Sequence, residues 1–340
     1  MKKLLFIILS AAILGCIATC FFNLYLHPDV RYFLHAAEIS DRWETQIREE
    51  AGGAPVYIFA GGSEMRTSVD PQILHDEYGI FAVNAAMAAG FGCRSNMLSA
   101  LKYARRGDIL IASIDINSFI VPNDEGACVA IYRRKAAAFT TTGLGLPWTD
   151  FFALFKSHSA SVSMYLAKRI LTPHLLYRYD QQTRLHPSGL MDIQYTDIQD
   201  APPPSIPNNV AMHLPQASED FIRFSRDLQQ LCRQQEIKLW IWRAPQLSNP
   251  NLEVAAALNT LALVRLGYKV LKEEHFNISA DVRQFSDRTF HCSLKGAVIN
   301  THKLAHQIHH PEFWTEEELV HWLRQRGFSQ DGTRLQKASF

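Results

Sequence analysis

The sequence has almost no net charge, and its cysteines follow no recognisable pattern. Its 34 lysines and arginines nearly balance 33 aspartates and glutamates, so the formal net charge is +1. Such a protein has no overall attraction for nucleic acid, and we expect no nucleic-acid partner. The 6 cysteines include no CxxC pair, which argues against a cysteine-ligated metal site. One or two disulfides would fit an exported protein, and buried thiols are the alternative.

The chain has only one long apolar run, at its N-terminus. Lys2 and Lys3 precede residues 4–26, in which Ser10, Thr19 and Asn23 are the only clearly polar side chains. At about 1.5 Å per residue, a helix of this length crosses a hydrocarbon core of roughly 30 Å. The two lysines favour a cytoplasmic N-terminus, so the rest of the chain would be translocated.

Three interpretations of this run remain open. We favour a retained signal anchor, that is, a transmembrane helix over residues 1–27, because the run is long and lacks an A-x-A exit. The second is a cleaved signal peptide. The third is a lipoprotein signal, since Ile13-Leu14-Gly15-Cys16 resembles a lipobox. All three place the remaining chain outside the cytoplasm, on the periplasmic or cell-surface side.

The remainder of the chain has the composition of a folded domain, with 47% apolar and 20% charged residues. Four short apolar runs predict buried strands, and the segments between them predict helices. The strands are expected at 55–60, 80–83, 109–114 and 237–242, with a short fifth at 268–271. Helices are expected at 70–78, 94–106, 221–235, 251–266 and 294–308. Alternation at this spacing predicts a three-layer α/β/α domain around a parallel sheet.

The domain organisation follows from these elements. The α/β domain is expected over residues 28–310, with an insertion at about 119–215 that contains Pro202-Pro203-Pro204. The insertion is interpreted as helices and one extended loop. The charge-rich segment 42–50 is interpreted as a solvated stalk or a first helix. Residues 311–340 are expected to form one more helix and a polar tail.

Polar residues follow three of the predicted strands. Ser63 follows the first strand within Gly61-Gly62-Ser63, Asn84 follows the second, and Asp115 and Asn117 follow the third. Functional groups of an open parallel sheet gather at the carboxyl ends of its strands. A serine at the start of a helix can act as a nucleophile when a base takes its proton. The alternative is that Ser63 only caps a helix.

A second polar block lies far away in the sequence. Asp287 and His291 are four residues apart, close enough for the carboxylate to orient the imidazole ring. A base and its orienting acid are the partners that a nucleophilic serine needs. Because the chain has 14 histidines, the spacing alone is weak evidence. We therefore expect Ser63 Oγ and the His291 ring to lie within about 3 Å of each other if the site exists.

These two blocks resemble the SGNH (GDSL-like) hydrolase superfamily. The first reads Ile-Phe-Ala-Gly-Gly-Ser-Glu-Met-Arg-Thr-Ser-Val-Asp-Pro over residues 58–71, and the second Asp-Arg-Thr-Phe-His-Cys-Ser-Leu-Lys-Gly-Ala over residues 287–297. The layout is similar to membrane-anchored members that act on bacterial envelope polysaccharides, including the alginate-acetylation proteins. The resemblance covers residues 55–117 and 238–308. It implies an SGNH-hydrolase-like, flavodoxin-like fold.

The resemblance also implies roles for individual residues. Ser63 would be the nucleophile, His291 the base and Asp287 its orienter. The oxyanion donors would be the Ser63 backbone N–H, Gly90 with Asn84 nearby, and Asn117. Gly62 replaces the aspartate of the GDS signature, and the third block reads Ile-Asp-Ile-Asn in place of Gly-x-Asn-Asp.

The expected function is an extracytoplasmic, membrane-tethered esterase or O-acyltransferase, such as an acetyltransferase, acting on acyl esters of envelope glycans. It would need no cofactor. Its expected partners are the membrane, an envelope polysaccharide and a membrane-bound acyl-donor protein. The alternative is an inactive SGNH-like protein that binds a glycan or acts as a scaffold in an envelope polysaccharide assembly.

Two further groups of residues receive simpler interpretations. His302, His306, His309, His310 and His321 suggest a metal site at first sight, but a solvated helix face explains them better. Trp240 and Trp242 straddle a predicted strand and are expected in the core or in the wall of a cleft.

Overall fold

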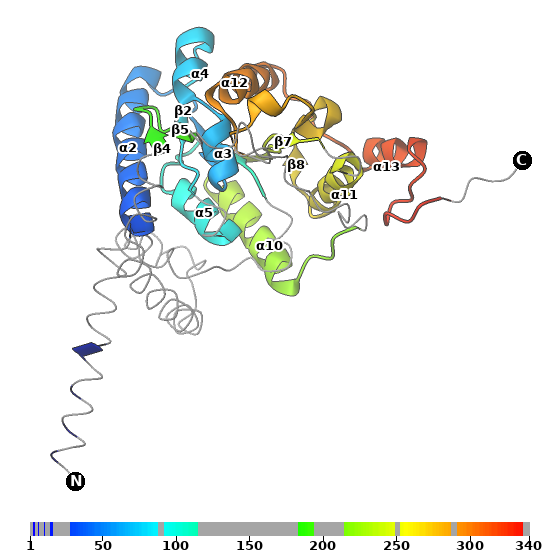
Figure 1. The fold of residues 1–340 in the computed structure, drawn as a ribbon, viewed down its shortest axis with the longest axis horizontal. Coiled ribbons are helices and arrows are strands. Elements are labelled where there is room, and N and C mark those ends of the chain that lie inside the picture. The colour runs from blue at the N-terminus through cyan, green and yellow to red at the C-terminus, as the bar shows by residue number, and fades with distance from the viewer. Residues whose placement is uncertain are drawn as a thin grey trace, which may run out of the picture.

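The centre of the molecule is a sheet of five parallel strands flanked by helices (Figure 1). The structure is a computed structural model that describes residues 28–87, 92–114, 183–193, 214–248, 252–286 and 291–335, together with Lys3, Phe6, Ser10, Leu14 and Gly15. The strands are β1 (Tyr57–Ala60), β2 (Ala82–Asn84), β3 (Ile109–Ala112), β6 (Lys238–Ile241) and β8 (Lys269–Val270). Their order across the sheet is β2-β1-β3-β6-β8. The predicted α/β class with a parallel sheet is confirmed.

The strands are mostly apolar because the sheet is covered on both faces; the exceptions are Lys238 and Lys269, which begin β6 and β8, and Asn84, which ends β2. In β1, Ile58 points to one face and Phe59 to the other, and both are fully buried. Ile58 is paired with Val83 of β2 on one side and with Leu110 of β3 on the other. β1 is therefore an interior strand, and the loop that follows it leaves the sheet near its middle.

Two layers of helices cover the sheet. On the face of Ile58 lie α2 (Pro28–Ala51), α5 (Gly92–Leu101), α10 (Glu219–Gln234) and α11 (Leu252–Arg265). On the face of Phe59 lie α3 (Ser63–Ser68), α4 (Pro71–Tyr78) and α12 (Leu294–His309). α13 (Glu316–Gln325) packs on α11 through Leu319 and Leu323, which are both fully buried. The C-terminal helix is thus part of the folded body.

Local signals correctly predict several helix ends. Asp70 accepts a hydrogen bond from the Gln72 backbone N–H at 2.9 Å, and Gly79 ends α4 with a φ of 66°. Ser218 caps α10 by accepting from the Phe221 N–H at 3.2 Å. The prediction for α5 is wrong at its C-terminal end, because the helix ends at Leu101 and not at Arg106.

Of the two interpretations of residues 42–50, the first helix is confirmed and the solvated stalk is wrong. These residues form the C-terminal part of α2, which is a helix packed against the sheet. Trp43 and Ile47 are buried in the core, and Trp43 Nε1 donates a hydrogen bond to the Ala82 carbonyl at 2.8 Å. Trp43 and Ile47 lie four residues apart on one helix face, but this pattern is hard to recognise in the sequence because charged residues surround it.

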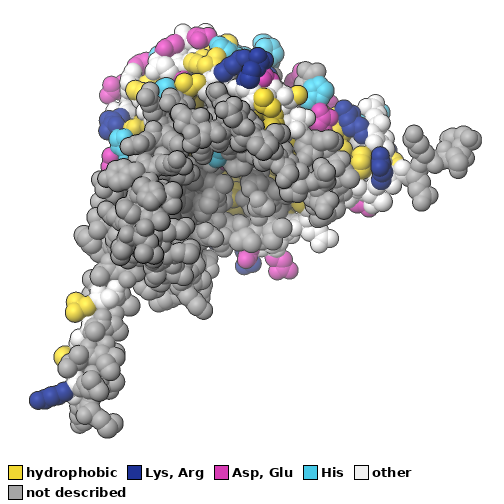
Figure 2. Space-filling view, viewed as in Figure 1, with side chains coloured by type: hydrophobic (Ala, Val, Ile, Leu, Met, Phe, Trp, Pro, Cys, Tyr) yellow, Lys and Arg dark blue, Asp and Glu magenta, His cyan; other side chains and the backbone are white. Residues whose placement is uncertain are grey.

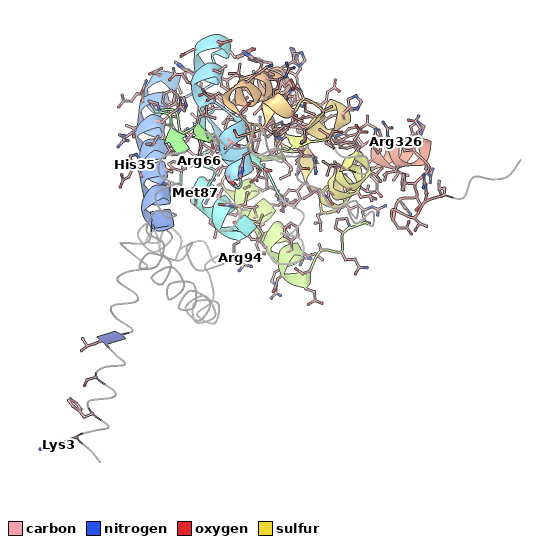
Figure 3. The ribbon with its side chains drawn as sticks, viewed as in Figure 1. Lys3, His35, Arg66, Met87, Arg94 and Arg326 are labelled. Atoms are coloured by element: carbon pink, nitrogen blue, oxygen red, sulfur yellow. The ribbon has the colours of Figure 1, made fainter. Side chains whose placement is uncertain are left out.

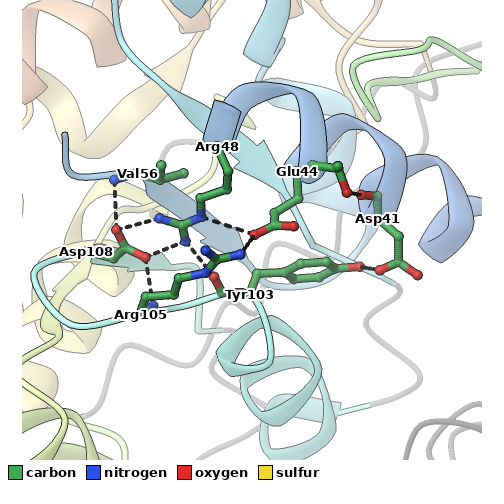
Figure 4. Close-up of polar contacts among 8 residues, drawn as sticks. Asp41, Glu44, Arg48, Val56, Tyr103, Arg105 and Asp108 are labelled. Carbon is green, nitrogen blue, oxygen red and sulfur yellow. Dashed lines mark hydrogen bonds and ion pairs between the residues drawn. The ribbon is translucent and has the colours of Figure 1, made fainter. Parts of the chain in front are cut away.

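A polar network joins the C-terminal half of α2 to the sheet (Figure 4). Arg48 binds both carboxylate oxygens of Asp108, at 2.9 and 2.5 Å, and donates to the Tyr103 carbonyl at 2.6 Å. Asp108 also accepts from the backbone N–H groups of Val56 at 2.9 Å and Arg105 at 2.7 Å. Because Asp108 is buried, these donors replace the hydrogen bonds that its carboxylate oxygens would make with water.

Several small elements have no clear sequence signal. The hairpin β4 (Thr183–Leu185) and β5 (Met191–Ile193) is the described part of the predicted insertion. A second small sheet pairs β7 (Gln246–Leu247) with β9 (Ile278–Ser279). Two 3-10 turns, η5 (Glu274–Asn277) and η6 (Val282–Gln284), lie between β8 and α12. These pieces have only two to four residues, which is too short for a periodic pattern.

The predicted transmembrane helix lies outside the described residues, apart from Lys3, Phe6, Ser10, Leu14 and Gly15. Within the described part of the chain, no helix is both long enough and apolar enough to span a bilayer.

The described surface carries no large patch of one charge on the face shown in Figure 2, where acidic and basic side chains are interspersed. Cys93, Cys232 and Cys292 are buried as thiols. Burial raises the pKa of the Cys232 thiol to about 12. For these three cysteines, the interpretation as buried thiols applies.

Candidate active site

Ser63 lies at the carboxyl end of β1, where α3 begins. α3 and α4, which follow β1, lie on the Phe59 face, whereas α10, which precedes β6, lies on the Ile58 face, so the strand order reverses between β1 and β3. In open parallel sheets ligands bind at this point, outside the carboxyl ends of the strands.

The interpretation of Ser63 as a helix cap is wrong. Gly62 occupies the N-cap position, and Ser63 is the first residue of α3. The Gly62 N–H donates to Glu64 Oε1 at 3.0 Å, and Gly62 has a φ of −83°, which any residue can adopt. The Ser63 hydroxyl is thus available for a contact outside its own helix.

Gly61 is the glycine that this turn requires. A Cβ at Gly61 would lie 3.1 Å from Met65 Cβ and 3.1 Å from Ser113 Cβ, closer than ordinary van der Waals contact. The Gly61 carbonyl accepts a hydrogen bond from the Met87 N–H at 3.0 Å. The turn that presents Ser63 is therefore packed between the segments that follow β2 and β3.

His291 contacts Ser63 directly. Its Nε2 lies 2.8 Å from Ser63 Oγ, and both side chains are partly buried. The two residues are 228 positions apart in the sequence. The distance is the one that the sequence analysis expects. In the neutral ring with the proton on Nδ1, Nε2 accepts the hydrogen bond from the hydroxyl, which is the geometry of a base activating a serine.

The segment that carries His291 is held on the Ser63 helix. The backbone N–H of Cys292 donates to Thr67 Oγ1 at 3.2 Å, and Ser68 Oγ donates to Cys292 Sγ at 3.3 Å. Thr67 and Ser68 are one turn after Ser63 on α3. The same short helix therefore presents the serine and positions the residue next to the histidine. Sequence reasoning missed these contacts. Both residues lie within the first sequence block, but nothing in the sequence shows that their side chains contact Cys292.

Gly296 has a steric role. A Cβ at this position would lie 2.0 Å from the Gln284 carbonyl oxygen, so only glycine allows η6 to cross the first turn of α12. Ser293 caps that turn by accepting from the Gly296 N–H at 3.2 Å. The glycine of the late sequence block thus permits the backbone contact beside His291.

Asp287 lies outside the described residues. The described residues on either side of it are joined, because the Ser286 N–H donates to the His291 carbonyl at 2.8 Å and Phe285 forms an antiparallel bridge with Cys292. These contacts hold Phe285 and Ser286 beside Cys292 and His291. The role of Asp287 stays a prediction, and so do the roles of Gly90 and Asn117, which also lie outside the described residues.

Asn84 is described, and its amide group is used within the fold. Its Nδ2 donates to the carbonyls of Val69 at 3.1 Å and Arg66 at 3.4 Å, and its Oδ1 accepts from the Ala86 N–H at 3.3 Å. The side chain is fully buried. These bonds occupy both amide hydrogens, so Asn84 supports the loops around the site and does not offer a donor to an oxyanion.

Arg66 is a second supporting residue that sequence reasoning missed (Figure 3). It is fully buried on α3, three residues after Ser63. Its guanidinium group donates to the Ala86 carbonyl after β2 and to the Ala36 carbonyl of α2, the latter at 3.0 Å. A buried arginine binding carbonyls joins α3, α2 and the β2 loop. An arginine in the turn after a candidate nucleophile is a weak sequence signal.

The histidines and tryptophans named in the sequence analysis have roles in the fold. In the described ranges, no three histidine, cysteine, aspartate or glutamate side chains are grouped as metal ligands would be. His302 Nδ1 is 2.6 Å from the Tyr78 hydroxyl, and the rings of His306 and His310 are 5.2 Å apart. Trp240 and Trp242 are buried in the core on the face of α3 and α12.

Comparison with known proteins adds no identification. A scan against protein-family models, a search of curated proteins and a search of solved structures found no match to this chain. The sequence and the geometry of the site therefore carry the functional conclusion.

Proposed function

We propose that the protein is an SGNH-like serine esterase or O-acyltransferase in which Ser63 is the nucleophile and His291 the general base. The observation that carries the proposal is the 2.8 Å contact between Ser63 Oγ and His291 Nε2. It joins two sequence blocks that had been singled out independently, and it lies at the carboxyl edge of the sheet.

In this proposal, Ser63 Oγ attacks the carbonyl carbon of an acyl ester while His291 Nε2 takes the hydroxyl proton. Asp287 orients the ring and stabilises the imidazolium that forms. The tetrahedral intermediate collapses to an acyl-serine, and His291 returns the proton to the departing alcohol oxygen. Attack by water then releases the acid, whereas attack by a sugar hydroxyl forms a new ester. The reaction needs no cofactor.

The oxyanion is assigned to the Ser63 backbone N–H at the start of α3, with Gly90 and Asn117 as the donors that the resemblance implies. The strand order supports the SGNH-like, flavodoxin-like assignment. If the five strands of this sheet are numbered 1 to 5 in chain order, their order across the sheet is 2-1-3-4-5, which is the flavodoxin-like doubly wound order.

The proposed location is the outer side of a membrane, with residues 4–26 as the anchor. The support is the apolar run behind Lys2 and Lys3. The proposed substrates are acyl esters of envelope glycans, and the proposed partners are an envelope polysaccharide and a membrane-bound acyl-donor protein. These assignments come from the resemblance.

The test is covalent labelling by a fluorophosphonate probe, which reacts with activated serines. We expect the wild-type protein to be labelled, Ser63→Ala to give no label, and His291→Gln to react about 10²–10⁴-fold more slowly, which is the usual contribution of a general base. Ser329→Ala and His310→Gln are matched controls on the C-terminal part of the chain, and both should be labelled at the wild-type rate.

A folded wild-type protein that takes no label, or Ser63→Ala labelled like the wild type, overturns the enzyme proposal. The first result, combined with glycan binding that is unchanged in Ser63→Ala and His291→Gln, would instead support the alternative of an inactive glycan-binding or scaffold protein.

A further inference from the structure

The direction of α2 relates the candidate active site to the N-terminal end of the chain. Near its start, α2 contacts the carboxyl edge of the sheet. Arg66 Nη2 donates to the Ala36 carbonyl at 3.0 Å, and Ser40 Oγ donates to the carbonyl of Asn84, the last residue of β2, at 2.8 Å.

Near its end, α2 contacts the opposite edge. Arg48 binds Asp108, which immediately precedes β3, and Asp108 accepts from the N–H of Val56, which immediately precedes β1. α2 is therefore antiparallel to the strands, and it lies along one side of the sheet (Figure 1). Eight residues separate Ser40 from Arg48, about 12 Å of helix, which matches a four-residue strand of about 13 Å.

The candidate active site lies at the edge where α2 begins. Ser63 follows β1 directly, and Arg66, one helical turn later, is the residue bonded to Ala36. His291 is at the same edge because it contacts Ser63. In Figure 3, Arg66 and Met87 lie beside α2 near His35.

The order of the chain places the membrane segment on this side. The apolar run ends at Leu26, and α2 begins at Pro28. Along the helix, Pro28 is about 12 Å from Ala36 and about 30 Å from Arg48. With residues 4–26 in a bilayer, the short connection holds the edge that carries Ser63 close to the bilayer. The opposite edge is farther along α2.

We propose that the Ser63–His291 site faces the bilayer and acts on an acyl ester that is itself held at the bilayer surface. This inference rests on the proposed function and on anchoring by residues 4–26. An ester free in solution reaches any face of the protein, whereas an ester confined to the bilayer reaches only the face turned toward it. The orientation therefore selects membrane-held substrates through proximity.

The experiment uses the full chain in nanodiscs and two fluorophosphonate probes with the same reactive group. One probe is soluble, and the other is joined through a short linker to a phospholipid of the nanodisc. The key variant inserts seven helix-forming residues between Val30 and Arg31 in α2. Two helical turns move the folded body about 10 Å along the helix axis and nearly preserve its rotation. The control has seven residues inserted between Thr333 and Arg334, two exposed residues that follow the Gly332 turn.

We expect the lipid-joined probe to label wild type and the control with the Thr333–Arg334 insertion at equal rates, and the α2 insertion variant at least 10-fold more slowly. The soluble probe should label all three at one rate, which also shows that the variants are folded. Failure of the soluble probe on wild type overturns the proposed function. Soluble labelling without lipid-joined labelling, or equal lipid-joined labelling with and without the α2 insertion, overturns only the orientation and indicates a substrate in solution.

A second measurement needs no insertion. In a background with Cys16, Cys20 and Cys128 replaced by alanine, one dye is attached through Lys295→Cys in the first turn of α12, and another through Arg106→Cys before β3. Quenchers on the lipid headgroups should quench the first dye more strongly, because it lies near the carboxyl edge of the sheet. Equal quenching, or stronger quenching at position 106, contradicts the proposed orientation.

Discussion

A buried ion pair is one of the contacts that attach α2 to the sheet, and its removal is a sharp test of the packing described above. Asp108 is 2% exposed and accepts hydrogen bonds from both terminal nitrogens of Arg48 and from two backbone N–H groups. We consider Asp108→Asn. The amide nearly preserves the shape of the side chain, but it removes the charge and turns an N–H₂ group toward donors that need an acceptor.

The expected cost follows from the geometry. Removing one partner of a buried ion pair leaves the other charge uncompensated and typically costs about 3–5 kcal/mol. The Arg48 side chain is 12% exposed, so water does little to replace the lost carboxylate. At about 2.1 cal/mol/K per residue, the 340-residue chain has an unfolding entropy of about 0.7 kcal/mol/K, so each kcal/mol corresponds to about 1.4 °C in the melting temperature. We therefore expect Asp108→Asn to lower the melting temperature by about 4–7 °C.

The assay is thermal and urea unfolding of the protein in detergent, followed by tryptophan fluorescence. The control is Glu236→Gln, which breaks an ion pair with Arg106 in which both side chains are more than half exposed. Such pairs contribute about 0–1 kcal/mol. A loss in Asp108→Asn no larger than in the control would refute the reasoning, because it would show that α2 does not depend on the buried pair. The orientation proposed for the site would then lose its main support.

Three further predictions concern the surroundings of the site. Thr67→Val removes the acceptor of the Cys292 N–H, so it should lower the free energy of unfolding by about 1–3 kcal/mol and slow fluorophosphonate labelling at every pH. Thr67→Ser should restore both the stability and the labelling rate, and normal labelling in Thr67→Val would show that His291 needs no such support. Gly296→Ala places a Cβ 2.0 Å from the Gln284 carbonyl oxygen, so the free energy of unfolding in urea should fall by more than about 1 kcal/mol despite the better helix propensity of alanine. A variant as stable as the wild type would contradict the close contact. Burial raises the pKa of Glu273 to about 8, although Gln307, Lys303, Trp242 and Arg243 act in the opposite direction. Because ionising this carboxyl group then disfavours the folded state, the wild type should lose stability relative to Glu273→Gln as the pH rises from about 4.5 to 8, by up to about 1.4 kcal/mol per pH unit. A stability difference between the two proteins that does not change across this range would show that Glu273 ionises normally in the folded state.

Several parts of the fold could be predicted because their causes are local. Runs such as residues 57–60 and 109–112 are apolar throughout, as strands covered on both faces must be. Asp70 followed by Pro71, and Gly79 at the other end, mark the limits of a helix through bonds within a few residues. The interpretation of residues 42–50 as a solvated stalk, one of the two open for this segment, is wrong for the opposite reason. The charges of this segment are bound to partners as distant as Asp108, and no local pattern reveals them.

In the candidate site, too, local features could be predicted from the sequence and contacts between distant segments could not. The sequence indicated Ser63 and His291 as residues suited to nucleophile and base, because each is of the right type and follows a recognisable block. It also suggested Asn84 as an oxyanion donor, and the structure instead shows its amide bound to Val69, Arg66 and Ala86. Both residue type and position favoured that assignment, but hydrogen bonds formed on folding decide which polar groups remain available.

The sequence by itself determined the parallel α/β architecture, the chemical types at the site and the single apolar run before the domain. These follow from hydrophobic patterning and from residue identity, which are properties of short stretches of chain. Only the tertiary structure decided that Ser63 and His291 meet across 228 positions, that Thr67 and Ser68 hold the segment next to His291, and that α2 begins at the edge where the site lies. These features depend on contacts between distant segments, and such contacts exist only when the sheet has brought the segments together.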